Sequence, residues 1–125
     1  MRLTRNSGPP LLLTVDQQYV VVEATGARGP WKVSTRGYRY QLTDESEREL
    51  AGWHWHPHGN SSEQKPHVHV YQDPLTGLHL PTGRVSVESV LRMLLTEFGV
   101  RPCRADWEVV LNATEAAFVE WRMWG

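Results

Sequence analysis

The sequence lacks the features that would place it among disulfide-stabilised, secreted or membrane-spanning proteins. It has a single cysteine, Cys103, so no intramolecular disulfide can form, and a reducing, cytoplasmic environment is the expected setting. No apolar run approaches the length of a membrane-spanning helix, and residues 1–10 are not followed by a hydrophobic region long enough for a secretory signal. A net charge of −1 does not by itself predict a nucleic-acid partner.

What remains is the composition of one globular domain. The 125 residues are 40% hydrophobic and 22% charged, which is ordinary for a folded chain of single-domain size. A chain of this length buries enough surface to fold without disulfides. No internal repeat or linker is visible, so we expect residues 1–125 to form a single domain, of which residues 1–18 could be an irregular N-terminal segment.

Strand patterns fill the first two thirds of the chain. They cover residues 19–24, 31–42, 47–56 and 67–71, with a further short pattern at residues 78–80. Within the second of these patterns the apolar parity changes at Arg36 and Gly37, which is typical of a β-bulge that keeps the apolar side chains of both halves on one face. Leu50 falls on the opposite parity from its apolar neighbours, so it is either exposed or next to a second bulge at Ala51 and Gly52.

The period becomes helical in the last third of the chain. Apolar residues in 86–98 recur at intervals of three and four, with Ser86 as a candidate N-cap and Gly99 as a candidate C′ residue. Residues 106–122 predict a second helix, which residues 112–114 could split. Because the strands precede the helices, we predict an α+β fold, with one antiparallel sheet of four to five strands and the C-terminal helices packed on one face.

The tryptophans divide between the expected core and the end of the chain. Four of them fit core positions by parity or by their place in a helical stripe: Trp31, Trp53, Trp55 and Trp107. The other two, Trp121 and Trp124, end the chain and could cover the sheet or a partner.

All six histidines lie between residues 54 and 79, about a fifth of the chain. Because side chains alternate along a strand, the tryptophans and valines of two neighbouring strands would face the core, and the histidines between them the other side. Four histidines then share the face away from the helices: His54, His56, His67 and His69. Arg36 and Arg39 would lie on the same face, so the sequence predicts a basic, histidine-lined surface that is open to solvent.

Zinc binding is one chemistry that this surface could support. Three imidazoles and a water molecule form a known type of catalytic zinc site. The alternative zinc ligands are His54, His56, His67 and His69. However, two histidines separated by one residue lie on the same side of a strand with or without a metal, and no acidic residue completes the set at close spacing, so the pattern does not favour a metal.

Metal-independent cleavage of RNA is a second chemistry, because histidine titrates near neutral pH and can act as either acid or base. Neighbouring arginines would hold the phosphate, and the candidates are Arg36, Arg39 and Arg84. Arg36 and Arg39 could equally pair across the hairpin with the glutamates at positions 45, 47 and 49. A histidine nucleophile is a third chemistry, but Tyr71 stands where the HxHxH pattern of histidine-triad hydrolases has its third histidine.

The order of these motifs resembles the TumE family of toxin–antitoxin proteins. The resemblance rests on four segments: Tyr38-Arg39-Tyr40, GWHWHP at residues 52–57, PHVHV at residues 66–70, and residues 78–88 leading into the first helix. It implies a toxin that acts on RNA through His67 and His69, with His56 matching by position, and a helix-turn-helix antitoxin as partner. An uncharacterised sister group with the pattern WHWHP…PHVHV…PTGRVS is an alternative match.

We therefore expect a cytoplasmic, metal-independent ribonuclease of a bacterial toxin–antitoxin system, without a cofactor. The predicted catalytic residues are His56, His67 and His69, and the predicted substrate-binding residues are Arg36, Arg39, Arg84 and His54. RNA and the antitoxin are the expected partners, no membrane is involved, and a homodimer is left open. The alternatives are the zinc site and a non-enzymatic interaction module, immunity-like or antitoxin-like, that uses the exposed sheet or the end at Trp121 and Trp124.

Overall fold

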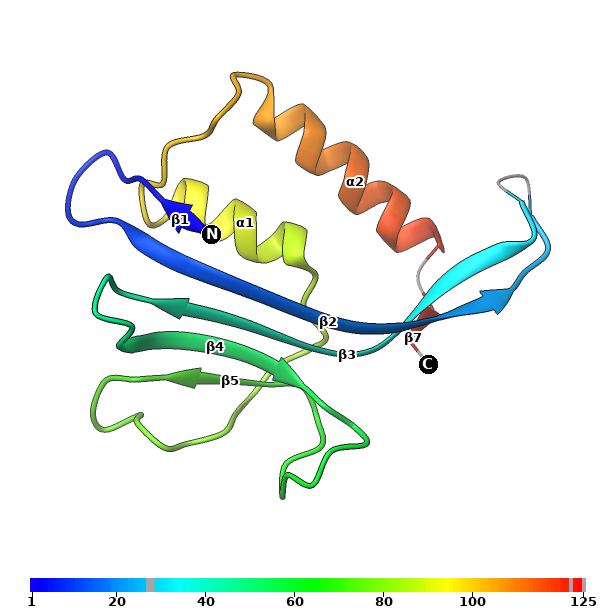
Figure 1. Cartoon of the computed structure of the whole chain (residues 1–125), viewed down its shortest axis with the longest axis horizontal. Helices are drawn as coiled ribbons and strands as arrows, with labels where there is room; N and C mark the ends of the chain where they lie inside the picture. Colours follow the sequence, from blue (N-terminus) through cyan, green and yellow to red (C-terminus); the bar gives the residue numbers. More distant parts are fainter. Residues whose placement is uncertain (27–28, 122, 125) are drawn as a thin grey trace.

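Four alternating segments form the main strands of an antiparallel sheet, in the same order as in the chain. These strands are β2 (Leu11–Glu23), β3 (Trp31–Thr43), β4 (Glu49–Trp55) and β5 (His67–Val70). The computed structural model describes residues 1–26, 29–121 and 123–124, with side chains up to residue 120. Two helices, α1 (Val87–Thr96) and α2 (Trp107–Trp121), lie on the same side of the sheet (Figure 1). The predicted α+β fold, with C-terminal helices on one face, is therefore confirmed.

Three further strands of two residues each bring the sheet to seven strands in the described part of the chain. β1 (Arg2–Leu3) and β6 (Leu80–Pro81) lie at its two edges, and β7 (Met123–Trp124) pairs in parallel with β3. The strand number exceeds the predicted four to five because a two-residue strand is too short to show an alternation in the sequence. β1 pairs with the beginning of β2, so part of residues 1–18 belongs to the sheet.

The bulge predicted in β3 is confirmed. Pairing between β2 and β3 shifts by one residue at Arg36, between Gly37 and Thr35. A Cβ atom on Gly37 would lie 2.8 Å from the carbonyl oxygen of Trp55, so only a glycine permits this close approach of β4. The parity change in the sequence therefore marks both the bulge and its position.

A second bulge explains the parity of Leu50. Leu42 of β3 pairs with Ala51, but Thr43 pairs with Glu49, which leaves Leu50 as the additional residue. Leu50 packs against the core as a result. The sequence offered two explanations, exposure of Leu50 or a second bulge at Ala51 and Gly52. The bulge is correct, but it lies at Leu50.

The face of the sheet toward α1 forms the core. Its buried strand residues are Leu11, Leu13, Tyr38, Tyr40, Leu42 and Trp55, and α1 contributes Val90 and Leu94. Trp53 is partly buried and packs on the same cluster. The tryptophans of β4 therefore face inward, as their parity predicts.

The helices follow their sequence signals. The Ser86 hydroxyl accepts a hydrogen bond of 3.1 Å from the backbone N–H of Ser89, which confirms the predicted N-cap of α1, and Gly99 has a φ of 66° just after the helix. α2 is continuous, without the split that the sequence left open, and it contacts α1 through an ion pair of 3.1 Å between Arg92 and Glu115. No helix in the described ranges is long and apolar enough to cross a membrane.

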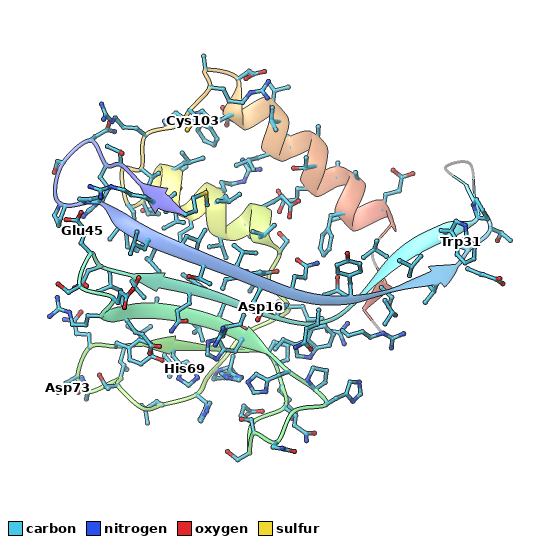
Figure 2. The ribbon with its side chains drawn as sticks, viewed as in Figure 1. Asp16, Trp31, Glu45, His69, Asp73 and Cys103 are labelled. Carbon is cyan, nitrogen blue, oxygen red and sulfur yellow. The ribbon has the colours of Figure 1, made fainter. Side chains whose placement is uncertain are left out.

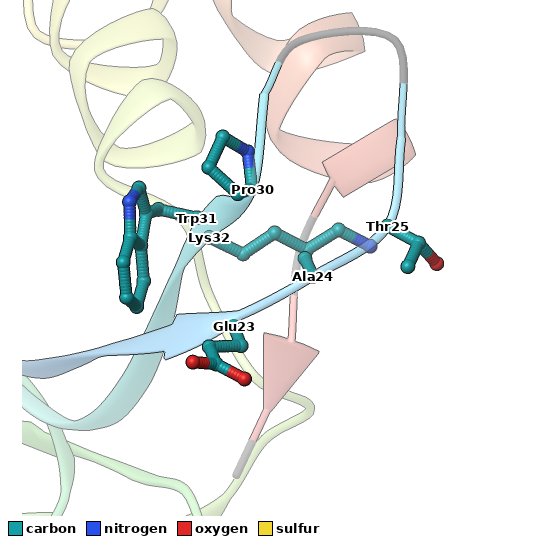
Figure 3. A pocket seen from close by; sticks show the side chains of 6 residues that line it. All are labelled: Glu23, Ala24, Thr25, Pro30, Trp31 and Lys32. Atoms are coloured by element: carbon teal, nitrogen blue, oxygen red, sulfur yellow. The ribbon is translucent and has the colours of Figure 1, made fainter.

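The end of the β2–β3 hairpin projects away from the rest of the sheet (Figure 1). The prediction that Trp31 belongs to the core is wrong, because Trp31 lies on this projecting end and is 60% exposed. An open pocket of about 510 Å³ is found there, lined by Glu23, Ala24, Thr25, Pro30, Trp31 and Lys32 (Figure 3). The side chains of Trp121 and Trp124, which the sequence offers as a cover or a partner surface, lie outside the described residues.

Candidate functional site

The register of β4 and β5 brings three histidines to one face of the sheet. His54 pairs with His67, and Gly52 pairs with His69. Directly opposite residues of antiparallel strands point to the same side, here the side away from Trp55 and the core. Figure 2 shows His69 on the side of the molecule opposite the helices. The prediction that these histidines share one face is confirmed.

The ring nitrogens of these three residues converge. His54, His67 and His69 each offer one nitrogen atom, and the three atoms lie within 4.8 Å of one another. His54 and His69 are half-buried and His67 is buried. The group therefore combines closeness with partial exclusion of solvent, which is the environment in which imidazoles bind metal ions.

Two further rings join the group. The ring centroid of His67 lies 5.3 Å from that of His56 and 4.9 Å from that of His79, and the centroids of His79 and His69 are 4.7 Å apart. We call these five residues the histidine cluster: His54, His56, His67, His69 and His79. The sequence predicted the first four and missed His79, because the strand that places it, β6, begins one residue later and is only two residues long.

His67 lies at the centre of the histidine cluster and is 1% exposed. The prediction of a solvent-open histidine surface is therefore wrong at this position, since alternation assigns a face but not a depth. The Nδ1 atom of His67 lies 2.8 Å from the carbonyl oxygen of Lys65. A carbonyl can only accept, so Nδ1 carries a proton and donates it to Lys65, and in the neutral ring Nε2 carries the lone pair. That Nε2 is buried and has no hydrogen-bond partner among the described residues.

The His54 ring lies over a position that has no side chain. A Cβ atom on Gly52 would come within 2.9 Å of the Nε2 atom of His54, so the glycine makes room for the ring. Burial, followed by the neighbouring rings of His69 and His67, lowers the pKa of His54 to about 4. His54 is therefore neutral at physiological pH, and its buried Nε2 also lacks a hydrogen-bond partner among the described residues.

The ring of His69 contacts Tyr71 and the backbone of Leu78. Its ring stacks on Tyr71, with centroids 6.1 Å apart, and it forms a hydrogen bond with the backbone of Leu78. Burial, more than the neighbouring rings, lowers the pKa of His69. Tyr71 is itself hydrogen-bonded to Glu49, and burial with this hydrogen bond raises the pKa of Tyr71 to about 12. Glu49 also accepts a hydrogen bond from Gln41, so this carboxylate is held in place beside the cluster.

Arg39 is the predicted phosphate-binding residue that lies closest to the histidines in the pairing scheme, because it is directly opposite His54. It forms a long ion pair of 3.9 Å with Asp16, rather than with a glutamate of the following turn. Arg39, Asp16 and His56 line one pocket of about 270 Å³, together with Gln18, Tyr38 and Trp55. The structure thus brings one predicted substrate-binding residue and one predicted catalytic residue together.

The other two arginines are placed differently. Arg36 is the additional residue of the β3 bulge, beyond the last pair that β3 forms with β4. Arg84 lies over the ring of Trp55, with its Cζ atom 4.2 Å from the ring centroid. Because Trp55 belongs to the helix-covered face, Arg84 is on the opposite side of the sheet from the histidine cluster. His58, the sixth histidine, is exposed in the loop after β4.

Comparisons with known proteins do not extend these observations. No family model, curated protein or solved structure matches this chain. The chemistry of the histidine cluster is therefore inferred from its own residues.

Proposed function

We propose that this protein binds a divalent transition metal ion, with zinc as the favoured ion, through His54, His67 and His69. The observation that carries the proposal is the convergence of their ring nitrogens within 4.8 Å. Zinc–nitrogen bonds of about 2.0–2.1 Å in a tetrahedral arrangement hold ligand nitrogens about 3.4 Å apart, which small rotations of these rings would provide.

The surroundings of His67 match those of a metal ligand. A ligating histidine usually donates its second ring N–H to a carbonyl or carboxylate, which fixes the ring and directs the other nitrogen at the metal. The Lys65 carbonyl has this role toward Nδ1 of His67. The remaining nitrogen is buried, and a buried polar atom without a partner destabilises a fold by about 1–3 kcal/mol. A bound ion would supply the missing partner.

The electrostatics of the cluster also favour a metal over a proton. Crowding of several imidazoles out of solvent disfavours the imidazolium form, as the lowered pKa values of His54 and His69 indicate. Neutral imidazoles are the form that binds transition metals. An ion held by three of them would leave a position for water and would lower the pKa of that water toward about 7, so hydrolysis is the chemistry that such a site would support.

Metal analysis and binding measurements test the proposal. We expect protein purified without chelator to contain close to one zinc per chain, and zinc to raise the melting temperature of EDTA-treated protein. His67→Ala should weaken zinc binding by about a hundredfold or more, because it removes the central ligand. His58→Ala is the matched control, since it removes an exposed histidine outside the cluster. Equal zinc affinity in the wild type and His67→Ala would refute the proposal.

RNA cleavage is a second candidate function, favoured by the pocket that Arg39 shares with His56. An arginine beside an imidazole is the pairing that phosphodiester cleavage needs, with or without a metal. Purified protein would be incubated with RNA in the presence and absence of EDTA. Cleavage that survives EDTA and is lost in His56→Ala would support the metal-independent ribonuclease predicted from the sequence, whereas intact RNA in both conditions would remove this candidate.

The toxin role and the helix-turn-helix antitoxin partner stay predictions, and growth tests the toxin role. Induction of the wild type in a bacterial host should arrest growth, and induction of a His67→Ala/His69→Ala variant should not. Equal growth of both cultures with intact cellular RNA would exclude the toxin. An interaction module would instead retain its partner after the double substitution.

A further inference from the structure

We infer that His79 is a fourth, exchangeable ligand of the metal ion proposed for His54, His67 and His69. The inference rests on the proposed metal site and adds the state of its fourth coordination position. In the closed state the His79 imidazole would occupy the fourth coordination position. When His79 moves away, this position would be open to water or to the anionic group of a substrate.

The placement of His79 follows from the register at the edge of the sheet. β5 pairs with β6 through His67 with Pro81 and Val68 with Leu80. One step further along the same register, position 79 falls opposite His69, on the face of the sheet that carries the cluster. The ring of His79 is there, with centroids 4.7 Å from His69 and 4.9 Å from His67. The proposed ligands are spaced similarly, since the centroids of His67 and His69 are 5.0 Å apart.

His79 differs from the other three histidines in how it is held. His54, His67 and His69 lie within paired strands and are buried or half-buried, whereas His79 is exposed and precedes β6. Residues 72–78 before it are also exposed. Two backbone hydrogen bonds form within this loop, from the Leu75 N–H to the Gln72 carbonyl and from the Leu78 N–H to the Leu75 carbonyl. The ring of His79 can therefore leave the cluster without breaking strand pairing.

The loop that carries His79 also touches one of the proposed ligands. The Leu78 backbone is hydrogen-bonded to His69, so the residue before His79 orients the ring of His69. This arrangement parallels the Lys65 carbonyl that orients His67 two residues away. The loop that contacts the His69 ring also carries His79, whose ring lies 4.7 Å from that of His69, so the position of this loop would affect both the fourth position and the geometry of His69.

Cobalt substitution tests this inference, because the absorption of Co²⁺ reports changes in its ligands. EDTA-treated wild type, His79→Ala and the control His58→Ala would each be titrated with Co²⁺ and then with azide. We expect His79→Ala to bind Co²⁺ about tenfold more weakly than the wild type, and its cobalt to bind azide at concentrations at least about tenfold lower. Added imidazole should return the His79→Ala spectrum toward that of the wild type. His58→Ala should match the wild type throughout.

The outcomes separate this inference from the proposed function. If the wild type binds Co²⁺ but His79→Ala has the same cobalt affinity and the same azide response, the inference is wrong and the three-histidine site stands. If the wild type does not bind Co²⁺ or Zn²⁺, the proposed metal site fails and the inference fails with it. His79→Gln, which keeps a polar side chain at the exposed position, replaces His79→Ala if the circular dichroism of His79→Ala departs from the wild type.

Discussion

The two faces of β3, β4 and β5 differ in whether their buried polar groups have hydrogen-bond partners. On the helix-covered face, Tyr38 and Tyr40 stack with centroids 4.7 Å apart, and the Tyr38 hydroxyl accepts a hydrogen bond from the Val85 backbone N–H. On the other face, His54 and His67 bury ring nitrogens that have no hydrogen-bond partner among the described residues. The first face satisfies its groups and stabilises the fold, while the second holds groups that a ligand would satisfy.

The largest expected effect that distinguishes the faces is on stability. Leu42 has 0% of its surface exposed, so Leu42→Ala should leave a cavity and lower the free energy of unfolding by about 2–5 kcal/mol. His67→Ala truncates a residue of similar burial but also removes an unpartnered nitrogen, so in metal-free protein its effect should be less than half as large. Urea unfolding of both variants in EDTA measures the difference. Equal destabilisation would mean that the histidine face is an ordinary core.

Alternation was sufficient to predict which face each residue of the main strands occupies. It assigned Trp55 to the core and His54 and His67 to the other side, and the parity change at Arg36 located a bulge. These results depend only on the two-residue period of a strand, which every long strand must obey.

Depth and short elements could not be predicted in the same way. The rings around His67 come from residues 54–56, from its own strand and from the segment before β6, and no local pattern records that convergence. His79 joins the cluster through a two-residue strand, which has no period. Arg84 follows a turn, and its placement over Trp55 rather than beside the histidines depends on the path from β6 to α1. Trp31 has the parity of the core, but its part of the hairpin extends beyond it.

The pH dependence of stability should divide between the two faces. Burial keeps the pKa of His54 near 4 in the folded state, so the unfolded chain takes up the proton first as the pH falls. Metal-free protein should therefore lose stability between about pH 6.5 and pH 4, by on the order of 2 kcal/mol after allowance for partial exposure of the ring. Burial raises the pKa of Tyr38 and Tyr40, so stability should also fall above about pH 10.

Single substitutions test which face causes the loss of stability at low pH (the acid limb) and which causes the loss at high pH (the alkaline limb). His54→Phe should reduce the acid limb and leave the alkaline limb, and Tyr40→Phe should reduce the alkaline limb and leave the acid limb, because His69 and Tyr38 keep their shifted pKa values. Chemical unfolding at a series of pH values in EDTA gives both limbs. An acid limb that is unchanged in His54→Phe would show that groups other than His54 control acid stability.

The smallest expected effect tests the packing that positions one ligand. Gly52 faces the histidine side, and a methyl group there would lie 2.9 Å from the Nε2 atom of His54, so Gly52→Ala should push that ring out of the converged group. We expect zinc affinity to fall about tenfold, which corresponds to about 1.4 kcal/mol, with little change in the metal-free unfolding free energy. Gly83→Ala is the control, because a Cβ atom at Gly83 meets no heavy atom of the described chain within 4 Å. If Gly52→Ala binds zinc as tightly as Gly83→Ala, His54 is not a ligand, and the metal must be held by His67 and His69 with another member of the cluster.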